Sequence, residues 1–449
     1  MFKKIEIWIL YLVVLLGIPV IIGFGSVVRQ EIIGGTKLGR ISKTSLFFAE
    51  IPSKIMKIAS LNNDLQVEDR FPLLVGGFNG TPNSSESYLL LSRYDGDLKE
   101  GIVDLIDLTN FKVLHTWNPD IDKFNKSVEK VDEFKFLNRD RNNSRYLLKH
   151  PIIVEDGGLV YKHSSPLIKI DACSNLIFQN THDEFHHSIE KDIEGNLWVP
   201  SRMYPQFLEV EKVGRDKYAD DTIVKLSPDG DILFEKSISQ IFIDNGLEYL
   251  LFALGNKRLN LDPIHLNDIQ PVDFDGEFWK KGDVFLSMRN QSMVALYRPS
   301  TNKIIWKGNG PFFHQHDVDI LNDHTISVFN NNSKDFSDGR VVDGNNEVII
   351  YNFKNNEYSF YFNDSLIKND VRTTTQGTSQ ILPNGDLFVE ETNFGRSLYF
   401  DSDGSLRWTH LNRAQNGKVY YVSWSRMLYS ARDIKMVNNF LNSKGKCND

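Results

Sequence analysis

Histidine is the residue type with the most evident chemical potential in this sequence. The chain has 11 histidines, and six of them fall in short segments that precede apolar, strand-like stretches. They are His150 in LLKHPIIVEDGG, His186 and His187 in FHHSIEKDIEGN, His265 in DPIHLNDIQPVDF, and His314 and His316 in FFHQHDVDIL. Near neutral pH a histidine can act as a nucleophile, a general acid or base, or a metal ligand. Any single one could instead bond neighbouring backbone, but the shared placement marks these segments as the candidate site.

The spacing of these histidines favours no metal or cofactor. In a strand, His314 and His316 should point the same way, whereas the adjacent His186 and His187 should point to opposite faces. No standard zinc spacing is present, and the sequence lacks a GxSxG elbow, a P-loop and a dinucleotide-binding GxGxxG. We therefore expect neither a catalytic metal nor a bound cofactor.

Repeated turns and strands must position the histidines. From about residue 70 onward, DG and NG turns are each followed by a β-prone run, as in DIEGNLWV, SPDGDILFE and LPNGDLFVE. Aligning these runs puts Trp198, Ser327 and Phe388 in one column, with His187 and His316 eleven residues before the first two.

Six segments emerge from this alignment, each long enough for about four strands: 71–117, 145–180, 182–236, 264–306, 311–362 and 372–410. Such repeats predict radial blades, whose closure removes open sheet edges. The prediction is an all-β, six-bladed β-propeller, with seven blades or a double sandwich as alternatives. The starts of the innermost strands then converge on the central channel, where a ligand would bind.

The N-terminus predicts a membrane-spanning helix. Residues 8–28 contain no charge and match a hydrocarbon core of about 30 Å as a helix. Lys3 and Lys4 precede them, so the positive-inside rule places the rest of the chain outside the cytoplasm, on the periplasmic or extracytoplasmic side of the cell (inner) membrane. A cleaved secretory signal is the alternative. We expect an anchor over 1–30, a connector over 31–70, the propeller over 71–430, and a C-terminal tail over 431–449 whose first part is a helix.

Composition excludes other classes. The formal net charge of −8 disfavours a nucleic-acid partner. The two cysteines, Cys173 and Cys447, cannot build a disulfide framework, which leaves one long-range disulfide or two thiols.

Several motifs in the second half of the chain carry a family resemblance. DPIHLNDIQPVDF, GDVFLSMRNQSMVALY, IIWKGNG, FFHQHDVDIL, ISVFNNN and DGR occur in this order. Together they resemble the bacterial arylsulfate sulfotransferase family, over about residues 145–430. The family fold is an exported six-bladed propeller. The resemblance implies transfer of a sulfuryl group from an aryl sulfate ester to a phenol without a nucleotide donor, through a transient sulfohistidine.

The resemblance also implies site residues. By motif, His265, His316 and Arg340 correspond to family residues that bind the sulfuryl oxygens or protonate the leaving phenolate. Arg suits an anion because its planar fork can hold two oxygens at once.

The sequence departs from the family at the nucleophile. The attacking histidine should lie in the blade after Arg340, but that blade opens with VRTTTQGTSQILPNG, which contains no histidine. Either His187 or His316 has taken over the attack, or the chemistry differs, or the channel only binds a ligand. A membrane-tethered propeller that binds a carbohydrate or a protein partner is therefore the alternative function.

Overall fold

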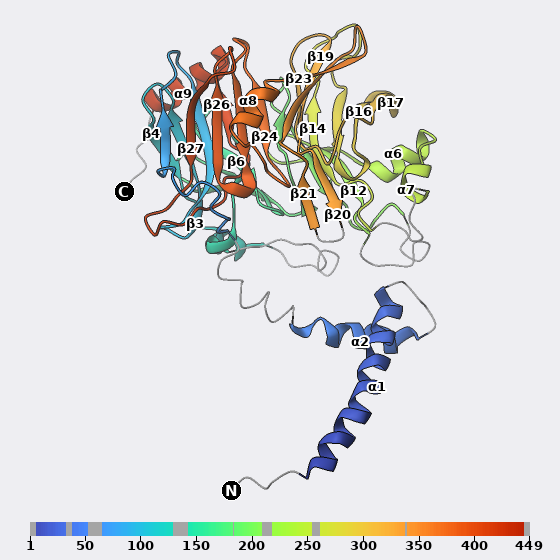
Figure 1. The fold of residues 1–449 in the computed structure, drawn as a ribbon. Helices are drawn as coiled ribbons and strands as arrows, with labels where there is room; N and C mark the ends of the chain where they lie inside the picture. Colours follow the sequence, from blue (N-terminus) through green and yellow to red (C-terminus); the bar gives the residue numbers. More distant parts are fainter. Residues whose placement is uncertain are drawn as a thin grey trace. The chain divides into compact units, whose positions relative to one another are not determined.

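The computed structural model describes residues 6–32, 38–52, 65–128, 142–182, 184–208, 218–253, 261–336 and 339–443. The chain separates into two compact units, Met1–Asp64 and Leu65–Asp449. Figure 1 follows the chain from its N-terminus to its C-terminus.

The first unit is helical. Helix α1 (Ile7–Ile32) contains a stretch, Tyr11–Ile32, of mean hydropathy 2.4 with none of it buried, which is long and apolar enough to cross a membrane. A signal sequence would have the same properties. Helix α2 (Gly39–Ala49) contacts α1, and its Ser42 hydroxyl donates a hydrogen bond of 2.7 Å to Glu31 of α1.

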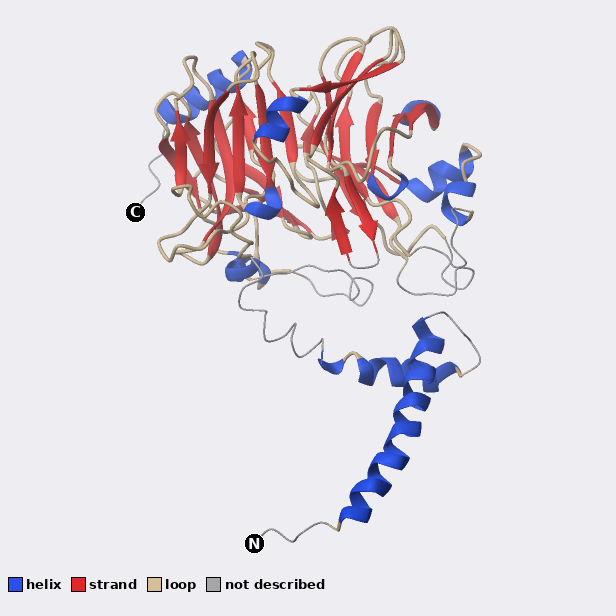
Figure 2. Ribbon diagram, viewed as in Figure 1, coloured by secondary structure: helices blue, strands red, loops and turns tan. Residues whose placement is uncertain are grey.

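The second unit is a β-propeller of six antiparallel sheets (Figures 1 and 2). From the innermost strand outward, the first three blades are β28 (Arg426–Leu428), β2 (Tyr88–Asp95), β3 (Glu100–Asp107) and β4 (Lys112–Trp117); β5 (Lys149–Ile153), β6 (Leu159–Lys162), β7 (Leu167–Ile170) and β8 (Leu176–Asn180); and β10 (Glu190–Lys191), β11 (Leu197–Arg202), β12 (Asp221–Leu226) and β13 (Ile232–Ser237), where β9 (Glu184–Phe185) also pairs with β11. The last three are β14 (Leu266–Pro271), β15 (Val284–Met288), β16 (Met293–Arg298) and β17 (Lys303–Gly308); β18 (Val318–Ile320), β19 (Thr325–Asn330), β22 (Glu347–Asn352) and β23 (Glu357–Tyr361); and β24 (Thr378–Ile381), β25 (Leu387–Glu391), β26 (Arg396–Phe400), β27 (Leu406–Leu411) and β1 (Gly77–Gly80). The predicted six-bladed fold is thus confirmed.

Short elements decorate the blades. They are the hairpin β20 (Ser333–Phe336) and β21 (Gly339–Val342), the helices α4 (Ile121–Asn125), α6 (Ile238–Asp244), α7 (Tyr249–Phe252), α8 (Asn363–Lys368) and α9 (Ala431–Ser443), and the 3₁₀ turns at Asn143–Arg145, Arg289–Gln291, Pro299–Thr301 and Thr392–Phe394. The predicted turns form as expected, because Gly195 and Gly385 adopt φ values of 89° and 87°.

Both ends of the second unit close the ring. Strand β28, near the C-terminus, is the innermost strand of the first blade, where it pairs with β2. Strand β1 is the outermost strand of the sixth blade, where it pairs with β27. The prediction that residues from 71 onward belong to the first blade is therefore wrong for β1. The first blade is therefore completed by a strand from the C-terminal part of the chain, and the last blade gains a fifth strand from the N-terminal part of the unit.

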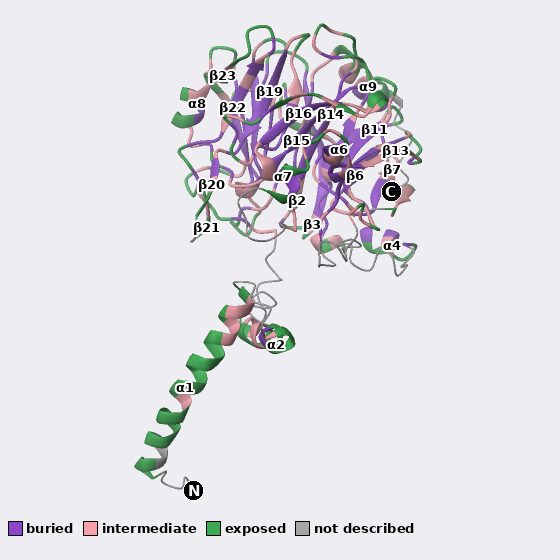
Figure 3. Ribbon diagram, turned by 90° about the vertical axis from the view of Figure 1, so that its right-hand side faces the viewer, coloured by how far each residue is buried: buried purple, intermediate pink, exposed green. Residues whose placement is uncertain are grey.

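Apolar cores lie between neighbouring blades, as the buried strands of Figure 3 show. One core joins Leu105 of the first blade to Leu159 of the second and includes Phe440 of α9. Phe440 stacks on Trp117 with a centroid distance of 5.9 Å. The helix expected after residue 430 is therefore confirmed as α9, and it packs on the propeller.

His410 lies on β27, outside the histidine segments named above, and is buried in the core. It is 5% exposed, and its ring centroid is 4.7 Å from that of Phe78. Burial, followed by the charge of Arg93, lowers its pKa to about 3. A lowered histidine pKa gives stability that is complete above the unfolded value of about 6.5 and is lost as the pH falls below it.

We therefore expect His410→Leu to change how stability depends on pH. Between pH 7 and pH 5 the wild-type chain should lose about 2 kcal/mol of unfolding free energy that the variant does not lose. Urea unfolding of both proteins at the two pH values measures this difference. A difference between the proteins that is the same at both pH values would contradict a neutral buried His410.

Candidate active site

Each blade has one residue with a left-handed backbone at the start of its innermost strand. These residues, with their φ values, are His150 (46°), His187 (56°), His265 (55°), His314 (56°), Gln376 (60°) and Trp424 (58°). Positive φ is uncommon for residues other than glycine and is unfavourable by about 1–3 kcal/mol. Because this unfavourable conformation recurs in every blade, we take this end of the channel as the candidate functional site.

Three predicted site residues meet here. The ring centroid of His187 lies 5.0 Å from that of His265 and 6.0 Å from that of His316. Trp424, from the closing strand, lies 6.3 Å from His187 and 6.1 Å from His316. Blades three, four and five therefore each supply a histidine to one cluster, which Trp424 borders.

His187 is oriented by a chain of buried groups. Its Nδ1 lies 2.8 Å from Nδ1 of His186, and Nε2 of His186 lies 3.1 Å from the buried carboxylate of Asp221. If His186 directs its Nε2 proton at that carboxylate, its Nδ1 must accept the Nδ1 proton of His187. The lone pair of His187 then resides on Nε2. The expectation that His186 and His187 point to opposite faces is wrong, because the left-handed backbone at His187 interrupts strand alternation.

The surroundings keep His187 neutral. Burial, followed by the neighbouring His186, His265 and His316, lowers its pKa well below the usual value. Burial likewise lowers the pKa of His186 to about 4. The side-chain nitrogen of Lys162 donates a hydrogen bond to the carbonyl oxygen of His187 and so supports its unusual backbone. His187 is consequently an unprotonated base at neutral pH.

His265 is held by a different carboxylate. Its Nδ1 lies 2.5 Å from Oδ2 of Asp262, three residues earlier in the chain. Burial alone would raise the pKa of Asp262, but the hydrogen bond and charge of His265, together with Arg202, lower it overall. Arg202 lies between the two carboxylates, 3.6 Å from Asp221 and 3.9 Å from Asp262. The contact with Asp262 fixes the orientation of the His265 ring and directs Nε2 away from Asp262.

Both ring nitrogens of His316 have partners. Nδ1 lies 2.6 Å from Oδ1 of Asn331, and the backbone N–H of Gln376 donates to Nε2 over 3.0 Å. Asn331 is itself fixed, because its Nδ2 donates to the carbonyl oxygens of Thr373 and Gln376. Burial lowers the pKa of His316 to about 3. His316 is therefore a neutral, fixed ring whose lone pair is already engaged.

Arg340 lies on the β20–β21 hairpin, next to the fifth blade. Its Nε and Nη2 donate to the two oxygens of Asp335 over 2.6 and 3.0 Å. Oδ2 of Asp335 is 3.5 Å from Nε2 of His314. The hairpin thus connects Arg340, through Asp335, to the histidine two residues before His316. The guanidinium group of Arg340 is therefore already bound to the carboxylate of Asp335.

A polar layer lies deeper in the channel. Arg426 contacts both oxygens of Glu190 at 3.1 Å and Nε2 of His150 at 2.7 Å. Burial raises the pKa of Asp317 to about 6. Among the described residues no group of three or more His, Cys, Asp or Glu side chains is arranged to hold a metal ion.

Sequence reasoning did not single out Asp221, Asp262, Asn331, Lys162 or Arg426. Asp262 is close to His265 in the sequence, but this spacing alone does not indicate a contact. The other four residues are far from the histidines that they contact, and no sequence pattern links them. Only the folded blades bring them together.

A six-bladed propeller with a histidine cluster at one end of its channel defines the class of this protein. The sequence profile described as Arylsulfotransferase (ASST) matches residues 150–413, and the chain belongs to this family. No curated protein matches the chain.

Several solved structures are similar in fold. A protein of unknown function from Bacteroides caccae is 12% identical, with 77% of this chain and 100% of that chain covered and a TM-score of 0.46. A streptogramin B lyase is 12% identical, with 78% and 96% covered and a TM-score of 0.37. The Pan2 WD40 domain of Neurospora crassa is 9% identical, with 79% and 89% covered and a TM-score of 0.41. These distant likenesses carry no information on function.

Proposed function

We propose that the protein transfers a sulfuryl group from an aryl sulfate ester to a phenol, with His187 as the nucleophile. One observation carries the choice of nucleophile: Nδ1 of His187 lies 2.8 Å from Nδ1 of His186, whose Nε2 is 3.1 Å from Asp221, and a proton directed at that carboxylate would leave the lone pair of His187 on Nε2. His316 is the weaker candidate, since Gln376 already donates to its Nε2.

The reaction would follow two balanced steps. First, Nε2 of His187 bonds to sulfur as the bond from sulfur to the aryl oxygen breaks, and the phenolate takes a proton from Nε2 of His265. Second, the acceptor phenol returns a proton to His265 while its oxygen bonds to sulfur and the N–S bond breaks. Asp221, acting through His186, would stabilise the positive charge on sulfated His187. This is covalent catalysis with a shared acid and base.

Arg340 is assigned to the sulfuryl oxygens, as the family resemblance implies. Its present partner, Asp335, is 55% exposed, and an exposed ion pair contributes only about 0–1 kcal/mol. A sulfate group could displace that carboxylate at little energetic expense. His316, fixed by Asn331 and Gln376, would form a wall of the pocket.

The decisive experiment is an assay of the detergent-solubilised full chain with 4-nitrophenyl sulfate as donor and phenol as acceptor. We expect release of 4-nitrophenolate together with formation of phenyl sulfate. Absence of both products with a range of donors and acceptors would reject the proposal. In that case binding of a carbohydrate or a protein in the channel would be the better proposal. The absence of a histidine from the segment around Gln376, where the family nucleophile is expected, agrees with such a role.

We further propose that α1 anchors the protein in the cell membrane with the propeller outside the cytoplasm. Lys3 and Lys4 precede the apolar stretch, and Cys173 is disulfide-bonded, which suits an oxidising compartment. Cys447 lies outside the described residues. The protein should remain in membranes washed with carbonate, and external protease should digest the propeller in cells with a permeable outer layer. Release into the wash or full protection would contradict this topology.

A further inference from the structure

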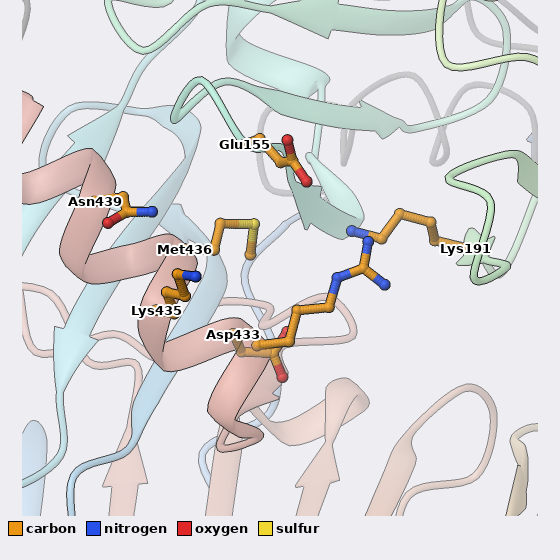
Figure 4. Close-up of a pocket in the computed structure, with 7 residues that line it drawn as sticks. Glu155, Lys191, Asp433, Lys435, Met436 and Asn439 are labelled. Carbon is orange, nitrogen blue, oxygen red and sulfur yellow. The ribbon is translucent and has the colours of Figure 1, made fainter.

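A second pocket lies at the other end of the channel. The innermost strands start at the histidine cluster, so the residues that follow or end them line the opposite end. Glu155 follows β5, Lys191 ends β10, and α9 begins soon after β28. A cavity of about 490 Å³ lies here (Figure 4). We call it the α9 pocket; its lining residues are Glu155, Lys191, Arg432, Asp433, Lys435, Met436 and Asn439.

Three cations, Lys191, Arg432 and Lys435, line the α9 pocket. Within the described part of the chain, the side chains of Lys191, Arg432 and Lys435 form no hydrogen bond or ion pair, whereas Lys225 pairs with Asp192 and Arg298 with Asp283. Burial, then the charges of Arg432 and Arg426, lowers the pKa of Lys191, while Asp433 and Glu155 act in the opposite direction. At Lys191 the positive charge of the two arginines therefore outweighs the negative charge of Asp433 and Glu155.

One of those carboxylates is already engaged. Asp433 accepts a hydrogen bond of 2.6 Å from the hydroxyl of Ser430, and the backbone N–H of Asp433 donates to that hydroxyl over 3.1 Å. This reciprocal cap starts α9, whose N-terminal end adds partial positive charge beside Arg432. Two carboxylates, Glu155 and Asp433, therefore face three cations in the lining of the pocket.

The α9 pocket also continues inward. A second cavity of about 190 Å³ shares Lys191, Asp433 and Met436 with it and reaches Arg426 and Gln380 on the innermost strands. Met436, together with Leu428 in the inner cavity, supplies apolar wall. A molecule with a charged group and an apolar body would satisfy both kinds of surface.

We propose that the α9 pocket binds a small organic anion, whose phosphate, sulfate or carboxylate group is held by Lys191, Arg432 and Lys435. This site lies at the opposite end of the channel from His187 and does not depend on sulfuryl transfer. An anion there would relieve the repulsion that Arg432 exerts on Lys191.

Isothermal titration of the full chain with inorganic phosphate at low salt tests the proposal. We expect one saturable site whose affinity falls as the salt concentration rises. The double variant Lys191→Gln/Arg432→Gln should weaken binding at least about tenfold. The matched control Lys307→Gln, which changes an exposed lysine on β17, should bind as the wild type does. His187→Asn should also bind normally, which separates this site from the proposed catalytic one.

Further titrations identify the anionic group. Binding of phosphate and sulfate without benzoate assigns a tetrahedral group, and binding of benzoate alone assigns a carboxylate. No saturable binding of any of the three, or equal binding by the double variant, would overturn the proposal. If the double variant does not fold, acetylation of the wild-type chain replaces it: phosphate should slow modification of Lys191 but not of Lys307, and equal slowing or none would overturn the site.

Discussion

Replacement of His187 by asparagine should abolish sulfuryl transfer, with kcat/KM falling on the order of 10⁴-fold. Asparagine is smaller than histidine and carries no basic nitrogen, so no bond to sulfur can form at this position. Rapid-quench mass spectrometry of the wild-type chain with a donor alone should find one added sulfuryl group on the His187 peptide, and none in the variant. The expected effect is large because the whole covalent path depends on one lone pair.

Two controls separate the nucleophile from its surroundings. His182→Asn changes a histidine of the same segment that is 49% exposed, and it should leave both turnover and the intermediate unchanged. His316→Asn should lower turnover while the sulfated His187 peptide still forms. If His187→Asn retains the intermediate and His316→Asn loses it, His316 is the nucleophile and its bond to Gln376 must open during the reaction.

The architecture was accessible from sequence because it repeats. DG and NG turns recur before β-prone runs, and the Trp198, Ser327 and Phe388 column corresponds to real strand positions, paired with Glu190, Asp319 and Gln380. The closing role of β1 was not accessible. Its four residues carry no repeat signal, and their pairing with β27 joins segments more than 300 residues apart.

The histidine segments were visible in the sequence, but their relation to one another was not. Side-chain alternation assumes extended backbone, and His187 has a φ of 56°. That single deviation accompanies the approach of its ring to His186, with the two Nδ1 atoms 2.8 Å apart. Asp221 lies 35 residues from His186, and Asn331 lies 15 residues from His316. No local pattern encodes contacts of that kind.

Asp262→Asn should lower kcat by about 10²–10³-fold, which lies within the contribution of about 10²–10⁴-fold typical of general acid–base catalysis. The carboxylate 2.5 Å from Nδ1 of His265 holds the ring in place and supplies a negative charge beside it during proton transfer, and an amide would supply no such charge. Donors whose phenols leave poorly need the proton most, so the loss should be greatest for phenyl sulfate and smallest for 4-nitrophenyl sulfate. A merely structural role of Asp262 would lower turnover equally for both donors.

Matched variants complete this test. Asp323→Asn alters another His–Asp pair, with His324, on the exposed part of the fifth blade, and it should leave the dependence on leaving group unchanged. Asp262→Glu, which retains the negative charge, should recover part of the loss. Arg340→Met should lower turnover for good and poor leaving groups alike, because its proposed partners are the sulfuryl oxygens, whose charge does not depend on the phenol. The opposite outcome is that Asp262→Asn slows both donors equally while Arg340→Met slows mainly phenyl sulfate. The proton would then come from a group near Arg340, and His265 would bind the sulfuryl group instead.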